Sequence, residues 1–142
     1  MTPPSKPLLL WDGDCDFCRL WVTRWQQALG DRVTCAPYQE VADRFPERPL
    51  ERFEQAVQLL EPDGRWSEGA EAVFRSLAHA PGRGLPLWLY RYLPGFAMAS
   101  EWVYRLIAKR RPVFSRLTRW LWGPHVVPPG VTFTSWLFLR LL

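Results

Sequence analysis

The sequence has only three cysteines and two histidines among its 142 residues, and its first residues are not expected to be a secretory signal. The first six residues, MTPPSK, are followed by only a brief apolar run, whereas a signal peptide has a longer apolar region. An odd number of cysteines without a signal argues against a secreted scaffold held by disulfides. A C-x-x-C pair in such a chain is expected to serve redox chemistry or metal binding.

Disorder and repeats are also excluded. Hydrophobic residues make up 48% of the chain, enough for a core, although fourteen prolines divide it into short elements. No internal repeat or low-complexity tract occurs. The net charge of +4 is unevenly distributed, because Glu101 is the only acidic residue from Arg83 onward. The sequence therefore predicts one folded chain with a basic C-terminal part.

The hydrophobic pattern of residues 1–80 predicts an α/β fold. Apolar runs at 8–11 and 33–36 predict strands, and the helical spacing of apolar residues from Phe17 to Ala28 predicts a helix that ends at Gly30. A weak helix at 38–45, strands at 56–61 and 65–67 and a helix at 68–79 are predicted to follow. The order β-α-β-α-β-β-α is that of thioredoxin, so the predicted fold class is a thioredoxin-like core.

The remaining residues form two predicted parts. After the turn sequence PGRG at 81–84, residues 81–128 are predicted to be a helical extension rich in aromatic and basic residues, with helices at 85–93, 96–110 and 113–122. Residues 129–142 form an apolar tail, which is predicted to be either a short docked segment or the beginning of a membrane segment.

The stretch LLLWDGDCDFC, residues 8–18, contains the main candidate site. Cys15 is expected at the first turn of the helix, where free N–H groups and the helix dipole favour a thiolate, and Cys18 lies one turn later, within disulfide reach. Asp12 is either a proton acceptor or a residue that closes the turn. The competing interpretation of the two cysteines is a pair of small buried hydrophobic residues.

Charged neighbours of Cys15 leave the direction of its pKa shift open. Asp14 and Asp16 oppose ionisation of the thiol, whereas Arg19 favours it. Cys35 lies in the middle of a predicted strand and is expected to be a core residue.

Two other chemistries lack the residues they need. A zinc site would have to add Cys35, His79 or His125 to the first pair, and none of these forms a second paired motif. LLLWDGD resembles the start of haloacid-dehalogenase-type phosphatases, with Asp12 as nucleophile and Asp14 as acid/base. That chemistry also needs a lysine and a later acidic pair, and no lysine occurs between residues 18 and 84.

The stretch WDGDCDFC resembles the signature of the DCC family of thiol-disulfide oxidoreductases, whose D-x-x-C-x-x-C motif is matched by Asp12, Cys15 and Cys18. EPDGRWSEGAEAVFRSL, residues 61–77, is similar to the family's second segment, and together the resemblance covers about residues 8–122. It implies a thioredoxin-like fold and dithiol chemistry without an organic cofactor.

Thioredoxins also have a cis-proline just before the third strand, and this sequence departs from that pattern. Pro49 lies several residues too early, and Phe53, Glu54 and Gln55 occupy the approach to the strand. The predicted function is thiol-disulfide exchange, with Cys15 as nucleophile, Cys18 as resolving thiol and Asp12 as proton acceptor. The alternative is a non-catalytic module that docks on a membrane protein.

The C-terminal part also suggests a location. Basic residues alternate with Trp and Tyr between residues 102 and 122, as in the belts that flank membrane segments. TSWLFLRLL, residues 134–142, resembles the entry to the first membrane helix of bacterial lipase-maturation-factor-like proteins. By the positive-inside rule the cysteine pair is then expected in the cytoplasm, at the cytoplasmic face of the membrane. Expected partners are a thiol or disulfide substrate, either a protein or a small molecule, and a membrane surface or membrane protein. Nucleic acid is not expected, because no recognition motif accompanies the belt.

Overall fold

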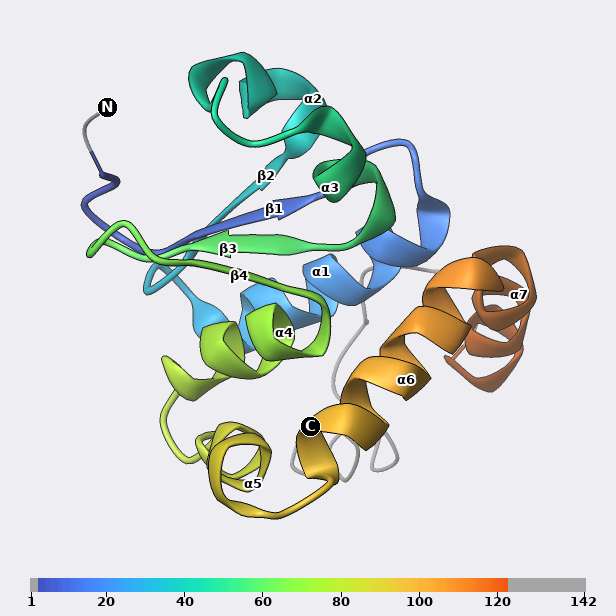
Figure 1. Cartoon of the computed structure of the whole chain (residues 1–142). Helices are drawn as coiled ribbons and strands as arrows, with labels where there is room; N and C mark the ends of the chain where they lie inside the picture. Colours follow the sequence, from blue (N-terminus) through green and yellow to red (C-terminus); the bar gives the residue numbers. More distant parts are fainter. Residues whose placement is uncertain (1–2, 123–142) are drawn as a thin grey trace.

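The computed structural model describes residues 3–122, and a four-stranded sheet forms its centre (Figure 1). Strand β1 (Leu8–Trp11) pairs in parallel with β2 (Thr34–Pro37) and antiparallel with β3 (Gln58–Leu60), and β4 (Trp66–Glu68) continues the sheet beyond β3. Because the side chains of a strand alternate between faces, both faces of β1 present leucines that need cover.

Helices cover both faces of the sheet (Figure 1). One face packs against α1 (Asp16–Leu29) and α4 (Gly69–Ala78), and the other packs against α2 (Tyr38–Val41), a 3₁₀ turn (Ala42–Arg44) and α3 (Leu50–Gln55). The first core contains Leu9, Leu29, Val33, Leu59, Ala72 and Ala80, and the second contains Leu8, Leu10, Phe45, Phe53 and Leu60. Each fully buried leucine or phenylalanine contributes about 1.5–3 kcal/mol by leaving water.

This architecture confirms the predicted α/β fold class with a thioredoxin-like core. Helix α3 was not predicted. Pro49 directly precedes its first residue, where a missing N–H costs nothing. The last helix was predicted to begin at residue 113, but α7 (Arg111–Trp122) begins two residues earlier and includes Pro112 in its first turn.

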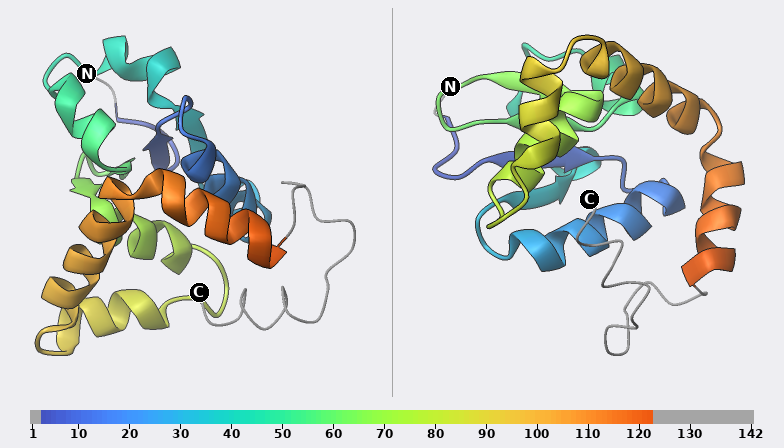
Figure 2. Two further views of the ribbon diagram at one scale, coloured as in Figure 1. Left: turned by 90° about the vertical axis from the view of Figure 1, so that its right-hand side faces the viewer. Right: turned by 90° about the horizontal axis from the view of Figure 1, so that it is seen from below.

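The C-terminal helices fold back onto the core (Figure 2). Helices α5 (Leu85–Tyr92) and α6 (Phe96–Lys109) pack against α4, and α7 packs against α1. The boundary between core and extension at residue 81 stays a prediction, and the predicted tail at 129–142 lies outside the described residues.

Glu101 of α6 ties the extension to the core. Its carboxylate accepts hydrogen bonds from the backbone N–H groups of Ala70 (3.4 Å) and Glu71 (3.1 Å) and from the hydroxyl of Tyr90 (3.0 Å). A carboxylate is favourable at a helix N-terminus because it satisfies free N–H groups and opposes the helix dipole. Gly69 makes room for it, since its φ is +65° and a Cβ there would lie 2.6 Å from a Glu101 oxygen.

Candidate active site

The cysteine pair lies at the junction between β1 and α1. Cys15 is the N-cap residue of α1, with φ −97° and ψ 112°, and its Sγ accepts a hydrogen bond from the backbone N–H of Cys18 at 3.2 Å. The backbone N–H of Cys15 donates to the carbonyl of Asp12 at 3.2 Å, which closes the preceding turn. Both cysteines are free thiols of intermediate burial. The structure thus places Cys15 where an anionic sulfur is favoured.

The two thiols have opposite pKa shifts. A hydrogen bond from the Cys18 side chain lowers the pKa of Cys15 to about 6, and the Cys18 backbone N–H and the Arg111 cation act in the same direction against burial and the Asp12 charge. The pKa of Cys18 is raised, first because its thiol donates that hydrogen bond and then because it is buried. Cys15 is therefore the ionised member of the pair and Cys18 the protonated one, a question that the sequence left open.

Asp12 combines turn contacts with a position beside the thiols. Its Oδ1 accepts hydrogen bonds from the backbone N–H of Asp14 (3.0 Å) and from Nε2 of Gln39 (2.7 Å), and its Oδ2 lies 3.5 Å from Nη1 of Arg111. Its negative charge raises the pKa of both cysteines. The turn contacts agree with the structural interpretation of Asp12, and its role as proton acceptor stays a prediction.

Gly13 lets this loop lie against β2. A Cβ on Gly13 would lie 2.8 Å from Cβ of Pro37, closer than two such carbons approach. The amide of Gln39 fixes the same loop, because its Oε1 accepts the backbone N–H of Gly13 at 3.0 Å. Arg19 donates to the Gly13 carbonyl at 2.7 Å. Hydrogen bonds with Gln39 and with Arg19 therefore hold the loop in place.

Arg111 was not expected in the site. Arg19 was predicted to favour the thiolate, but the cation that lowers the pKa of Cys15 is Arg111, the first residue of α7. Its Nη2 also donates to the carbonyls of Glu54 and Gln55, each at 3.4 Å. Its separation from Cys15 by 96 positions leaves no local signal that could have identified it.

An apolar cavity of about 50 Å³ lies beside Cys18. Helices α1 and α6, the start of α7 and the chain just before β3 form its walls. Among the residues that line it are Trp11, Phe17, Trp21, Phe53, Val57, Tyr104, Ile107 and Arg111. The extension therefore builds one wall of the site.

The other candidate residues lie apart from the pair. Cys35 packs against the core as expected, and burial raises its pKa to about 11. His79 follows the end of α4, with Nε2 at 3.3 Å from Glu61, and His125 lies outside the described residues. Within residues 3–122 no group of three or more histidine, cysteine and acidic side chains could hold a metal ion.

A thioredoxin-like core with a C-x-x-C pair at the start of its first helix defines the class of thioredoxin-like redox proteins. Residues 9–138 match the family described as DCC1-like thiol-disulfide oxidoreductase, and the chain belongs to this family. Neither a curated protein nor a solved structure gives a significant match.

Proposed function

We propose that this chain exchanges disulfides through Cys15 and Cys18. The observation that carries the proposal is the pairing of a thiol of lowered pKa, Cys15, with a protonated thiol one turn later whose backbone N–H donates to it. Family membership supports a redox role in general. The particular residues and their order of reaction are our proposal.

The reaction takes two steps and transfers two electrons. The Cys15 thiolate attacks one sulfur of the substrate disulfide, so that a mixed disulfide forms and the first substrate thiolate leaves. Cys18 then loses its proton, with Asp12 as the acceptor, and attacks the Cys15 sulfur, which releases the second substrate thiolate. The released thiolates take up protons, the protein is left with a Cys15–Cys18 disulfide, and a dithiol reductant returns it to the starting state.

A redox titration and two single variants test this mechanism. We expect the wild-type pair to equilibrate with a dithiol buffer at a defined potential, and Cys35→Ser to do the same. Cys15→Ser should abolish exchange, whereas Cys18→Ser should accumulate a mixed disulfide at Cys15 that mass spectrometry detects. Equal residual turnover in the Cys15 and Cys18 variants would refute the dithiol mechanism.

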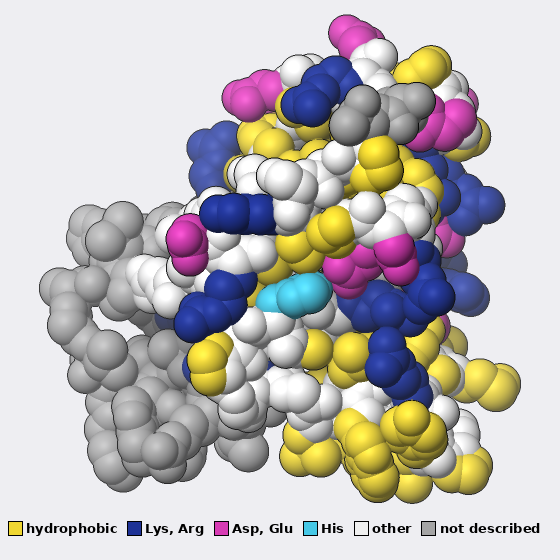
Figure 3. All heavy atoms as spheres, turned by 90° about the vertical axis from the view of Figure 1, so that its left-hand side faces the viewer, with side chains coloured by type: hydrophobic (Ala, Val, Ile, Leu, Met, Phe, Trp, Pro, Cys, Tyr) yellow, Lys and Arg dark blue, Asp and Glu magenta, His cyan; other side chains and the backbone are white. Residues whose placement is uncertain are grey.

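We further propose that the enzyme works at an anionic membrane surface on the cytoplasmic side. Helices α5 and α6 expose Trp88 (55%), Met98 (80%) and Trp102 (65%). Figure 3 shows hydrophobic side chains gathered where α5 lies, with Lys and Arg nearby. Large exposed apolar groups beside cations are typical of surfaces that bind anionic lipid.

The positive charge of this face favours an anionic lipid surface over a basic protein as its partner. Exposed cations of the extension are Arg91, Arg105, Lys109, Arg110 and Arg116. The one acidic residue between 83 and 122, Glu101, points to the N-terminus of α4. None of the helices in the described part of the chain has the length and hydropathy of a membrane span. The proposed contact of these helices is therefore with the membrane surface.

Vesicle co-sedimentation tests the membrane proposal. We expect the protein to bind vesicles that contain phosphatidylglycerol, to bind less at high salt, and not to bind neutral phosphatidylcholine vesicles. The double variant Arg105→Glu/Lys109→Glu should lose binding. Arg44→Glu/Arg65→Glu, which changes the charge by the same amount on exposed residues of the core, should keep it. Absence of binding at low salt, or equal loss in both variants, would refute the proposal.

A further inference from the structure

The segment Glu54–Val57 leads into β3 beside the cysteine pair. Because β3 pairs antiparallel with β1, with Leu10 opposite Gln58, the chain that enters β3 lies beside the residues that leave β1 and lead to the cysteine pair. Cys18 and Val57 also line the same cavity. An extended polypeptide gains affinity at such a position mainly by pairing its backbone with free N–H and C=O groups. Such binding would require free backbone N–H or C=O groups in residues 54–57.

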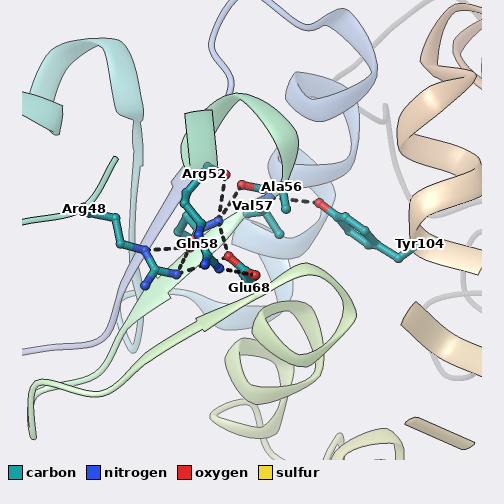
Figure 4. A network of polar contacts seen from close by, with 7 residues as sticks. All are labelled: Arg48, Arg52, Ala56, Val57, Gln58, Glu68 and Tyr104. Carbon is teal, nitrogen blue, oxygen red and sulfur yellow. Dashed lines mark hydrogen bonds and ion pairs between the residues drawn. The ribbon is translucent and has the colours of Figure 1, made fainter. Parts of the chain in front are cut away.

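Both backbone groups of Val57 are already paired. Its N–H donates to the hydroxyl oxygen of Tyr104 at 2.9 Å (Figure 4), and its carbonyl accepts from the N–H of Gly69 at 3.0 Å. Burial raises the pKa of Tyr104 to about 12, so the neutral hydroxyl persists across the physiological range. A substrate strand would have to displace Tyr104 to reach the Val57 N–H.

The neighbouring groups are paired as well. The N–H of Ala56 donates to the carbonyl of Arg52 at 3.2 Å, and the carbonyl of Ala56 accepts from Nε2 of the buried Gln58 at 3.1 Å (Figure 4). The carbonyls of Glu54 and Gln55 accept from Arg111. All four carbonyls from residue 54 to residue 57, and the last two N–H groups, are therefore used within the chain.

The contacts that occupy this segment are themselves firmly held. Gln58 Nε2 also donates to the Arg52 carbonyl at 2.9 Å, and its Oε1 accepts from Nε of Arg48 at 3.2 Å. The carboxylate of Glu68 forms ion pairs with Arg48 at 3.3 Å and with Arg52 at 2.8 Å. Displacing one member of this network would leave polar groups of the buried Gln58 amide unpaired, which is unfavourable away from water.

Cys15 lies on the loop side of the pair, between the exposed residues Asp14 and Asp16. A small molecule can approach its sulfur without any of the backbone groups of residues 54–57.

We infer, building on the proposed dithiol function, that this site reduces low-molecular-weight disulfides and that Tyr104 and Arg111 exclude extended polypeptide segments. For a small disulfide RSSR, Cys15 forms Cys15–S–SR and releases RS⁻, and Cys18 displaces the second RS⁻ while the protein becomes the disulfide. The two electrons come from the cysteine pair, and a dithiol donor restores them.

Single-turnover reduction of two substrates tests this inference. The reduced protein is mixed with 2-hydroxyethyl disulfide or with insulin, and each rate constant is divided by that of dithiothreitol with the same substrate. We expect the normalised rate for the small disulfide to exceed that for insulin by 100-fold or more. An equal or higher value for insulin would overturn the inference and leave the dithiol function intact. Reaction with neither substrate, together with failure of the redox titration, would instead refute the proposed function.

Two variants at Tyr104 test whether its hydroxyl and its ring exclude polypeptide substrates. Tyr104→Phe removes only the acceptor of the Val57 N–H, and Tyr104→Ala also removes the ring, so we expect the ratio of the insulin rate to the small-disulfide rate to rise in the order wild type, Phe, Ala. Tyr92→Ala removes an exposed tyrosine and serves as control. Thermal melts identify a variant that fails to fold, and Tyr104→Phe then decides. A ratio that Tyr104→Phe leaves unchanged would refute the role of the hydroxyl.

Discussion

At pH 6 the reaction rate of Cys15 should exceed that of an ordinary cysteine by a larger factor than at neutral pH. With a pKa of about 6, Cys15 is about 90% thiolate at pH 7 and about half thiolate at pH 6. An ordinary thiol with a pKa of about 8.5 is about 3% and about 0.3% thiolate at the same two pH values. The ratio of thiolate populations therefore grows from about 30 to about 160 as the pH falls.

The lower basicity of Cys15 offsets part of this advantage. With a Brønsted coefficient of about 0.45, a pKa difference of about 2.5 makes its thiolate about 13-fold less nucleophilic. Cys15 should then react about 2-fold faster than an ordinary thiol at pH 7 and about 12-fold faster at pH 6.

The assay follows the first turnover of the reduced protein with an excess of a small chromogenic disulfide, from pH 4.5 to 8.5, with glutathione as the ordinary thiol. Cys18 and Cys35 should not contribute to the fast phase, because their pKa values are raised. Mass mapping after brief alkylation should find the label on Cys15. A rate that keeps falling tenfold per pH unit between pH 8 and pH 6, or first labelling of Cys35, would refute the assignment.

Three further results should follow from the contacts of the site. Arg111→Gln should raise the pKa of Cys15 and move the midpoint of its pH–rate profile upward, whereas Arg110→Gln, at the neighbouring exposed position, should leave the midpoint in place. Asp12→Asn should slow exchange more than it lowers the melting temperature if the carboxylate accepts a proton; a large loss of stability with an unchanged rate would assign it to the turn alone. Gly13→Ala should destabilise the fold by about 1–3 kcal/mol in urea unfolding, because its methyl group would overlap Pro37, and full stability would contradict this geometry.

Local sequence was enough to predict the core and the cysteine pair. The order of strands and helices followed from patterns among neighbouring residues. These are the apolar run at 8–11, the helical apolar spacing after Phe17 and the stop at Gly30. The position of Cys15 at a helix start was likewise available, because Asp-Gly marks the end of the strand before it. Helix α3 was missed because its single turn and a half lies among prolines that usually interrupt structure.

Only the tertiary structure decided what surrounds the pair. The direction of the Cys15 pKa shift depends on a hydrogen bond from Cys18 and on the charge of Arg111, balanced against Asp12 and burial. Tyr104 reaches the Val57 N–H across 47 residues. Contacts of this kind arise when α6 and α7 fold back onto α1 and α4, and no local pattern encodes them. Propensity and periodicity act between near neighbours in the chain, whereas electrostatics and hydrogen bonding at the site act between groups that only packing brings together.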